Sequence, residues 1–152
     1  MAVRKKAFTL VELVLIVLFL GIFTAITIPR LNFAAVSKQK VECLVTKIVT
    51  DLRHTRTRAL NDAATNTAGF ALNMLGTAPY ASYKIINLDT EATVDSYTID
   101  SDIDCTGGDQ FEFEPSGELS DASDTEVNIS ADGTSFTITI LPTTGMVKYT
   151  ED

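Results

Sequence analysis

The side chains of this 152-residue chain best suited to bind or react are three alternating carboxylates. Asp100, Asp102 and Asp104 are spaced as at the start of an EF-hand calcium loop. The glycine that such a loop needs is replaced by Cys105, and Glu112 comes one residue too late to close it. Two interpretations therefore stay open, a calcium site and an acidic loop that water solvates.

Two cysteines and one histidine complete the set of reactive side chains. Cys43 and Cys105 would form a disulfide in an oxidising compartment, closing a long loop. Helical geometry places Cys43 about 200° from Val41, on the polar arc of its helix, which argues against that bond. His54 has no nucleophile or acid in a catalytic pattern near it, and no phosphate-binding loop or zinc spacing is present. The sequence therefore predicts no enzyme.

One carboxylate lies inside a long apolar segment near the N-terminus. Arg4, Lys5 and Lys6 precede residues 8–28, in which Glu12 is the only charged residue. As a helix, this run would be roughly 30 Å long, the thickness of a bilayer core. A carboxylate at such depth costs about 2.5–3.5 kcal/mol, so something must compensate it. The run is too long for an ordinary secretory signal peptide, and the sequence predicts a transmembrane helix.

The segment Lys5-Lys6-Ala7-Phe8-Thr9-Leu10-Val11-Glu12-Leu13 resembles the processing signal of type IV pilins and type II secretion pseudopilins. The resemblance implies that a prepilin peptidase cuts between Ala7 and Phe8 and that the new amino group of Phe8 is methylated. Most family members have glycine where this chain has Ala7, an accepted variant. Gly21 and Pro29 also lie where many pilins have a glycine and a proline.

In that family, the residue matching Glu12 is thought to meet the N-terminal amine of a neighbouring subunit and so to set the stagger between subunits. The resemblance makes Glu12 the expected assembly residue. Gly21 and Pro29 imply flexibility, because glycine frees the backbone and proline cannot donate to the preceding turn. A simple kink and partial unwinding in the filament are both compatible with these residues.

The helix of the apolar run is predicted to continue beyond it. Apolar residues recur at three- and four-residue spacing from Val41 to Ala59, whereas Lys47, Asp51 and Arg53 lie on the opposite, polar arc. This pattern indicates an amphipathic continuation of the first helix that ends near Asn61 and packs on a sheet.

The remaining residues predict short antiparallel strands. Ala131-Asp132-Gly133-Thr134 and Pro142-Thr143-Thr144-Gly145 are hairpin turns, so the C-terminus should be a three-stranded meander. The fold class is α+β and pilin-like, with a long N-terminal helix on a small antiparallel sheet. The expected strands are 69–74, 80–87, 96–99, 110–114, 126–130, 135–141 and 146–149. The expected organisation is a leader (1–7), a transmembrane or filament-core helix (8–30), its amphipathic continuation (31–60) and a periplasmic head (61–152).

The head also resembles, more loosely, the H-type minor pseudopilins. The residues that carry this resemblance are 113–117, 127–129, 138–147 and the helix end Arg56 to Ala59. It implies a minor subunit of a secretion pseudopilus or of a pilus-initiating complex.

Charge is divided sharply along the chain. Residues 1–60 contain 10 basic and 3 acidic side chains, whereas residues 61–152 contain 2 basic and 17 acidic ones, a net charge of −15. So acidic a head argues against nucleic acid as a partner, because phosphates require clustered lysine and arginine.

Together these features predict a structural subunit that enters the bacterial inner membrane as a single-pass prepilin with its head in the periplasm. The implied partners are other pilin or pseudopilin subunits, the prepilin peptidase, an inner-membrane assembly platform, and lipid before assembly. No cofactor is expected apart from the calcium considered above. The alternatives are a major type IV pilin and, from another class, an uncleaved membrane-tethered binding module.

Overall fold

A computed structural model describes residues 9–27 and 33–152 of the chain. Helix α1 (Leu10–Thr27) belongs to one compact unit, Met1–Ala35, and the rest of the chain from Val36 to Asp152 forms a second unit. Helix α2 (Phe33–Asn61) begins in the first unit and supplies the core of the second. We call the second unit the head.

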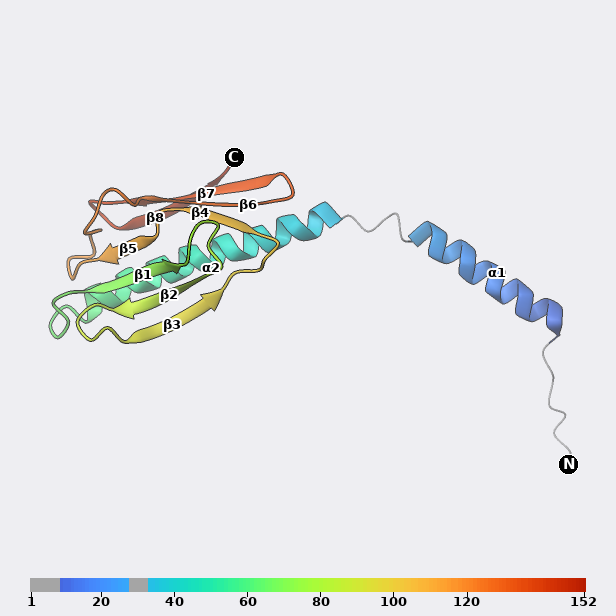
Figure 1. Cartoon of the computed structure of the whole chain (residues 1–152), viewed down its shortest axis with the longest axis horizontal. Helices are drawn as coiled ribbons and strands as arrows, with labels where there is room; N and C mark the ends of the chain where they lie inside the picture. Colours follow the sequence, from blue (N-terminus) through green and yellow to red (C-terminus); the bar gives the residue numbers. More distant parts are fainter. Residues whose placement is uncertain (1–8, 28–32) are drawn as a thin grey trace, which may run out of the picture. The chain divides into compact units, whose positions relative to one another are not determined.

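The head contains eight strands in two antiparallel sheets (Figure 1). The first sheet has the strand order β3-β2-β1-β5, and the second has the order β4-β6-β7-β8. The strands are β1 (Phe70–Leu75), β2 (Ser82–Asn87), β3 (Thr93–Thr98), β4 (Asp104–Gly107), β5 (Gln110–Phe113), β6 (Glu126–Ala131), β7 (Thr134–Leu141) and β8 (Met146–Glu151).

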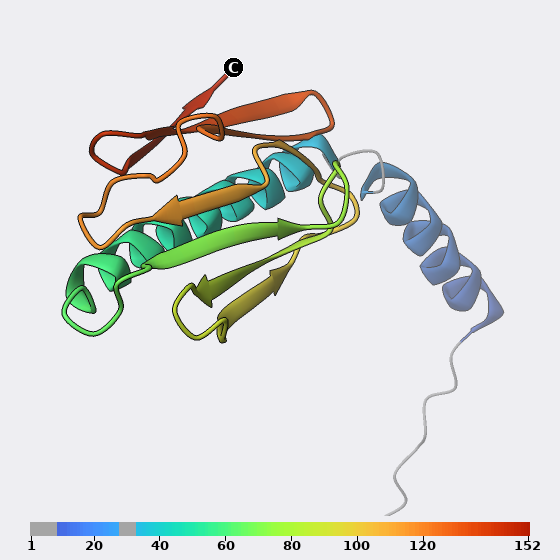
Figure 2. The same ribbon diagram turned by 60° about the vertical axis from the view of Figure 1, so that its left-hand side comes forward.

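Helix α2 lies alongside the sheets (Figure 2), and its buried side chains belong to one hydrophobic core with those of the strands. Its apolar stripe is buried, as the three- and four-residue spacing predicts, because residues at this spacing share one face of a helix. Phe111, Phe113 and Ile138 from the sheets are fully buried in the same core. The buried residues of the helix are Val41, Leu44, Val45, Ile48, Val49, Leu52 and Ala59.

Both predicted hairpins are confirmed. Ala131 pairs with Thr134 across a two-residue turn in which Asp132 and Gly133 have φ values of 47° and 80°. Positive φ at both positions is what an Asp-Gly hairpin turn requires. Leu141 pairs with Met146 across the second turn, which completes the meander of β6, β7 and β8.

The prediction of a single small sheet is wrong, because the strands of the head form two sheets. The head also contains one strand that the sequence pattern did not predict. This strand, β4, has only four residues, Asp104-Cys105-Thr106-Gly107, and pairs with β6. Aspartate and glycine, at its two ends, are depleted in strands, and its long-range pairing with β6 makes this segment a strand.

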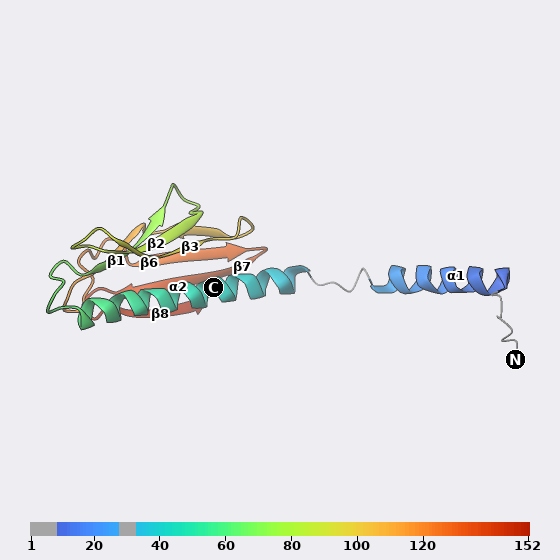
Figure 3. The same cartoon turned by 90° about the horizontal axis from the view of Figure 1, so that it is seen from below.

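One long helix is predicted from residue 8 to residue 60, and the structure has helical segments at Leu10–Thr27 and Phe33–Asn61, while residues 28–32 between them lie outside the described residues. Helix α2 ends at Asn61, as expected, and continues along the head (Figure 3). The predicted transmembrane or filament-core segment is residues 8–30, of which residue 8 and residues 28–30 lie outside the described residues. In the described part of the chain, no helix combines the length and the apolar character needed to cross a membrane.

Candidate functional site

The N-terminus of α1 is built around Thr9 and Glu12. The backbone N–H of Glu12 donates to Thr9 Oγ1 at 3.2 Å, and Leu13 N–H donates to the Thr9 carbonyl at 3.2 Å. Thr9 therefore caps the helix, and the spacing Thr-x-x-Glu is that of a capping box. The spacing of Thr9 and Glu12 in the sequence could have predicted this cap, which gives Thr9 a local structural role.

The Glu12 carboxylate itself forms no hydrogen bond or ion pair with any residue that the structure describes. It lies in the first turn of α1, where the helix dipole favours a negative charge. The processing-site residues Ala7 and Phe8, as well as Pro29, lie outside the described residues. Glu12 therefore has no side-chain partner among the described residues.

Helix α1 presents apolar side chains on all sides. Twelve large apolar side chains between Leu10 and Phe23 are exposed to between 46% and 79%. A helix that is apolar all round is normally buried in protein or lipid, so this surface needs an apolar covering.

Gly21 lies inside α1, and the helix continues through it to Thr27. Its backbone carbonyl accepts a hydrogen bond from Thr24 Oγ1 at 2.9 Å, and the Leu20 carbonyl accepts from the same hydroxyl at 3.0 Å. A Cβ at Gly21 would meet no described atom within 4 Å, so the glycine is not required by packing within the described chain.

The alternating aspartates bind a lysine in the structure. Lys40 Nζ donates to Asp100 Oδ2 at 2.9 Å and to Asp102 Oδ2 at 3.0 Å. These hydrogen bonds raise the pKa of Lys40, and the bond from Lys40 lowers the pKa of Asp100. Asp104 belongs to strand β4, and no group of three metal-ligating side chains occurs among the described residues. The structure therefore gives the calcium prediction no support, because an ammonium group already occupies the carboxylates.

Both cysteines are free, and the disulfide prediction is not supported. Cys43 is exposed on α2, as its helical phase predicts, whereas Cys105 is fully buried in β4 opposite Ile129. Burial raises the pKa of the Cys105 thiol to about 12. The two thiols thus differ in reactivity, because the thiolate is the reactive form.

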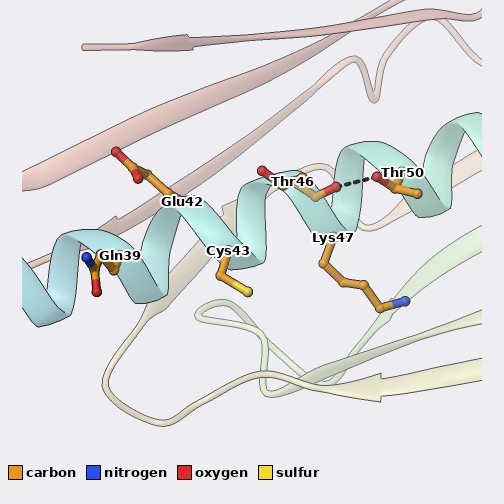
Figure 4. A pocket seen from close by; sticks show the side chains of 6 residues that line it. All are labelled: Gln39, Glu42, Cys43, Thr46, Lys47 and Thr50. Carbon is orange, nitrogen blue, oxygen red and sulfur yellow. Dashed lines mark hydrogen bonds between the residues drawn. The ribbon is translucent and has the colours of Figure 1, made fainter.

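A shallow cavity of about 510 Å³ lies along the exposed face of α2 (Figure 4). Its side chains have local partners, since Thr50 Oγ1 donates to the Thr46 carbonyl at 2.7 Å and Lys47 binds Asp51. His54 is exposed elsewhere on the helix and is not among the lining residues. The cavity offers no paired nucleophile and base. Its lining residues are Gln39, Glu42, Cys43, Thr46, Lys47 and Thr50.

The helical pattern placed Asp51 on the polar, solvent-facing arc of α2, and this prediction is wrong. Asp51 is buried, with 7% of its surface exposed. Its carboxylate accepts hydrogen bonds from Tyr83 Oη at 2.6 Å and from Lys47 Nζ at 2.8 and 2.6 Å. Burial, followed by the hydrogen bond to Asp51, raises the pKa of Tyr83. This network joins α2 to strand β2, and sequence reasoning missed it because it needs a contact 32 residues away along the chain.

No protein-family model, curated protein or solved structure matches the chain.

Proposed function

We propose that this chain is a structural subunit of a type II secretion pseudopilus or a type IV pilus. Within this class, we propose the role of a minor pseudopilin. It enters the inner membrane as a prepilin, is cleaved after Ala7, is methylated at Phe8, and assembles through its N-terminal helix. The observation that carries the proposal is the dense match of residues 4–29 to the prepilin signal.

The surface of α1 supports this proposal. Twelve exposed large apolar side chains would be covered first by lipid and then by the helices of neighbouring subunits. Covering such partly exposed side chains contributes on the order of 1 kcal/mol each. Transfer of these side chains from lipid to neighbouring helices keeps this gain but adds no further hydrophobic driving force, so helix packing and specific contacts must favour assembly.

The free carboxylate of Glu12 supports the proposed pairing between subunits. Cleavage before Phe8 creates a cationic amine at the start of the helix, close in sequence to Glu12. Opposite charges attract strongly in apolar surroundings, and an unpaired charge buried there costs about 3–5 kcal/mol. A subunit inserted at the wrong height would leave both charges unpaired, so the pair would select the correct register.

The first experiment measures the mass of the N-terminal peptide in sheared surface fibres and in washed membranes. A methylated Phe8 start confined to membranes supports the minor or pseudopilus subunit, whereas the same start abundant in fibres indicates a major pilin. An intact Met1 start in both fractions, with the peptidase present, refutes the proposal and leaves the tethered binding module.

The second experiment tests Glu12 directly. Glu12→Ala should be cleaved normally but should assemble at least about tenfold less, because the partner amine is left unpaired. Glu118→Ala removes an exposed carboxylate from the head and serves as the matched control. Assembly of Glu12→Ala at the wild-type level would show that Glu12 does not pair subunits.

A further inference from the structure

A basic cavity of about 540 Å³ opens where the last turns of α2 meet the turn between β7 and β8. Three of its lining residues, Arg53, Arg56 and Lys148, are cationic. Arg53 and Arg56 come from α2, and Lys148 is one of only two basic residues among residues 61–152. We call this feature the basic cavity.

Carbonyl oxygens, rather than carboxylates, hold the two arginines of the basic cavity. Arg53 Nη2 donates to the Val147 carbonyl at 2.9 Å, and Arg56 Nε donates to the Gly117 carbonyl at 3.0 Å. Each guanidinium has five N–H donors, so most of its donors are left for another ligand.

The lysines of α2 behave differently from its arginines. Lys38, Lys40 and Lys47 each form an ion pair with a carboxylate of the same chain. Within the described ranges, neither Arg53, Arg56 nor Lys148 has a carboxylate within ion-pair distance. The head therefore neutralises the lysines near the start of α2 and leaves the cations of the basic cavity available.

Arg56 is also fixed in place by two turns. Gly145, with φ of 61°, is so close that a Cβ on it would lie 2.1 Å from the Gly117 carbonyl oxygen and 2.8 Å from Arg56 Cδ. A side chain that is already packed and hydrogen-bonded loses little freedom when a ligand binds. A planar guanidinium held in this way suits a carboxylate, which it can bind through two parallel hydrogen bonds.

A hollow of opposite charge lies elsewhere on the head. Asp109, Glu112, Asp121 and Asp124 line this acidic hollow of about 350 Å³, and no lysine or arginine lines it. Its carboxylates accept hydrogen bonds from uncharged groups only, such as the Ser123 N–H on Asp121 at 2.8 Å and the Asp109 N–H on Asp124 at 3.1 Å.

We propose that the basic cavity of one copy of the chain binds the carboxylates of the acidic hollow of a second copy. Two different surfaces of the same chain then form a heterologous, head-to-tail contact between neighbouring copies. The inference rests on the proposed function and adds to it a contact between heads, separate from α1.

The test uses the purified full-length chain in detergent and measures self-association by sedimentation at about 50 mM salt. Lys148→Glu places a negative charge in the basic cavity and should weaken association at least about tenfold. Lys84→Glu on β2 is the matched control, because Lys84 is also without an ion pair among the described residues, and it should change association less than about twofold.

Charge exchange identifies the second surface. Asp121→Lys alone should also weaken association, and an equal mixture of Lys148→Glu and Asp121→Lys chains should restore it to within about threefold of wild type. Unchanged association of Lys148→Glu, or a mixture that restores nothing, overturns the inference.

The N-terminal mass is measured on the same preparations and separates the two proposals. A methylated Phe8 together with a Lys148→Glu chain that associates normally overturns the head contact and leaves the proposed function intact. An uncut Met1 in a chain expressed together with the prepilin peptidase overturns the proposed function, and the charge-exchange result still decides the contact between heads.

Discussion

The buried hydrogen bond between Tyr83 and Asp51 offers a direct test of how α2 is held on the first sheet. Tyr83→Phe removes one hydroxyl and keeps the ring, which is 1% exposed in the core. The lost bond, at 2.6 Å to Asp51 Oδ2, has a charged acceptor, and such bonds contribute about 1.5–3 kcal/mol. Lys47 still donates to both oxygens of Asp51, so the carboxylate is not left unpaired.

We therefore expect Tyr83→Phe to lower the free energy of unfolding by about 1.5–2 kcal/mol, the lower half of that range. For a head of this size, the loss corresponds to a decrease in Tm of roughly 5–12 °C. Urea unfolding of the full-length chain in detergent, followed by circular dichroism, measures the change.

Tyr97→Phe is the matched control. Tyr97 packs against Tyr83 with ring centroids 5.5 Å apart, but it is 37% exposed. Removing its hydroxyl should change stability by less than about 0.5 kcal/mol. The reasoning is refuted if Tyr83→Phe is as stable as wild type, or if Tyr97→Phe loses as much stability.

The same tyrosine predicts a pH dependence. Its pKa is raised in the folded chain, so its contribution to stability is complete below the ordinary tyrosine value of 10.0 and is lost as the pH rises above it. Above that pH the unfolded chain releases the phenol proton, whereas the folded chain keeps it. Wild type should therefore lose stability more steeply than Tyr83→Phe between about pH 10 and pH 11.

Three further predictions concern other parts of the head. Gly69→Ala should destabilise it severely, by more than about 3 kcal/mol, because the added Cβ would lie 2.0 Å from the Phe113 carbonyl oxygen at φ of 87°. Gly133→Ala, also at positive φ but with no atom within 4 Å, should cost only about 1 kcal/mol, and equal Tm values for the two would contradict this explanation. A thiol reagent at pH 8 should label Cys43 at once and Cys105 only after unfolding, and rapid labelling of both would show that β4 opens. Neither calcium nor a chelator should shift the Tm, because Lys40 already pairs with the loop carboxylates; a rise with calcium would restore the metal site.

Local pattern was sufficient for the parts of the fold that depend on neighbouring residues. The stripe of α2 was predictable because the same 3.6-residue period that forms the helix also places Val41 and Leu52 on its buried face. The Asp132-Gly133 turn was predictable because few residue pairs tolerate positive φ at both positions. The hypothesis for Glu12, likewise, came from a short contiguous segment and needed no tertiary contact.

The sequence by itself thus determined the two helices, the C-terminal meander, the division of charge and the assembly hypothesis. Only the tertiary structure decided that there are two sheets, that Asp104–Gly107 is a strand, and that Asp51 is buried against Tyr83. It also decided that Lys40 binds the aspartates, whereas Arg53 donates to the backbone carbonyl of Val147. Each of these outcomes depends on residues that are far apart in the chain, and their contacts form only when packing brings α2 and the strands together. A local sequence pattern does not show which distant residues come into contact. It therefore predicted the helices and strands better than the contacts between them.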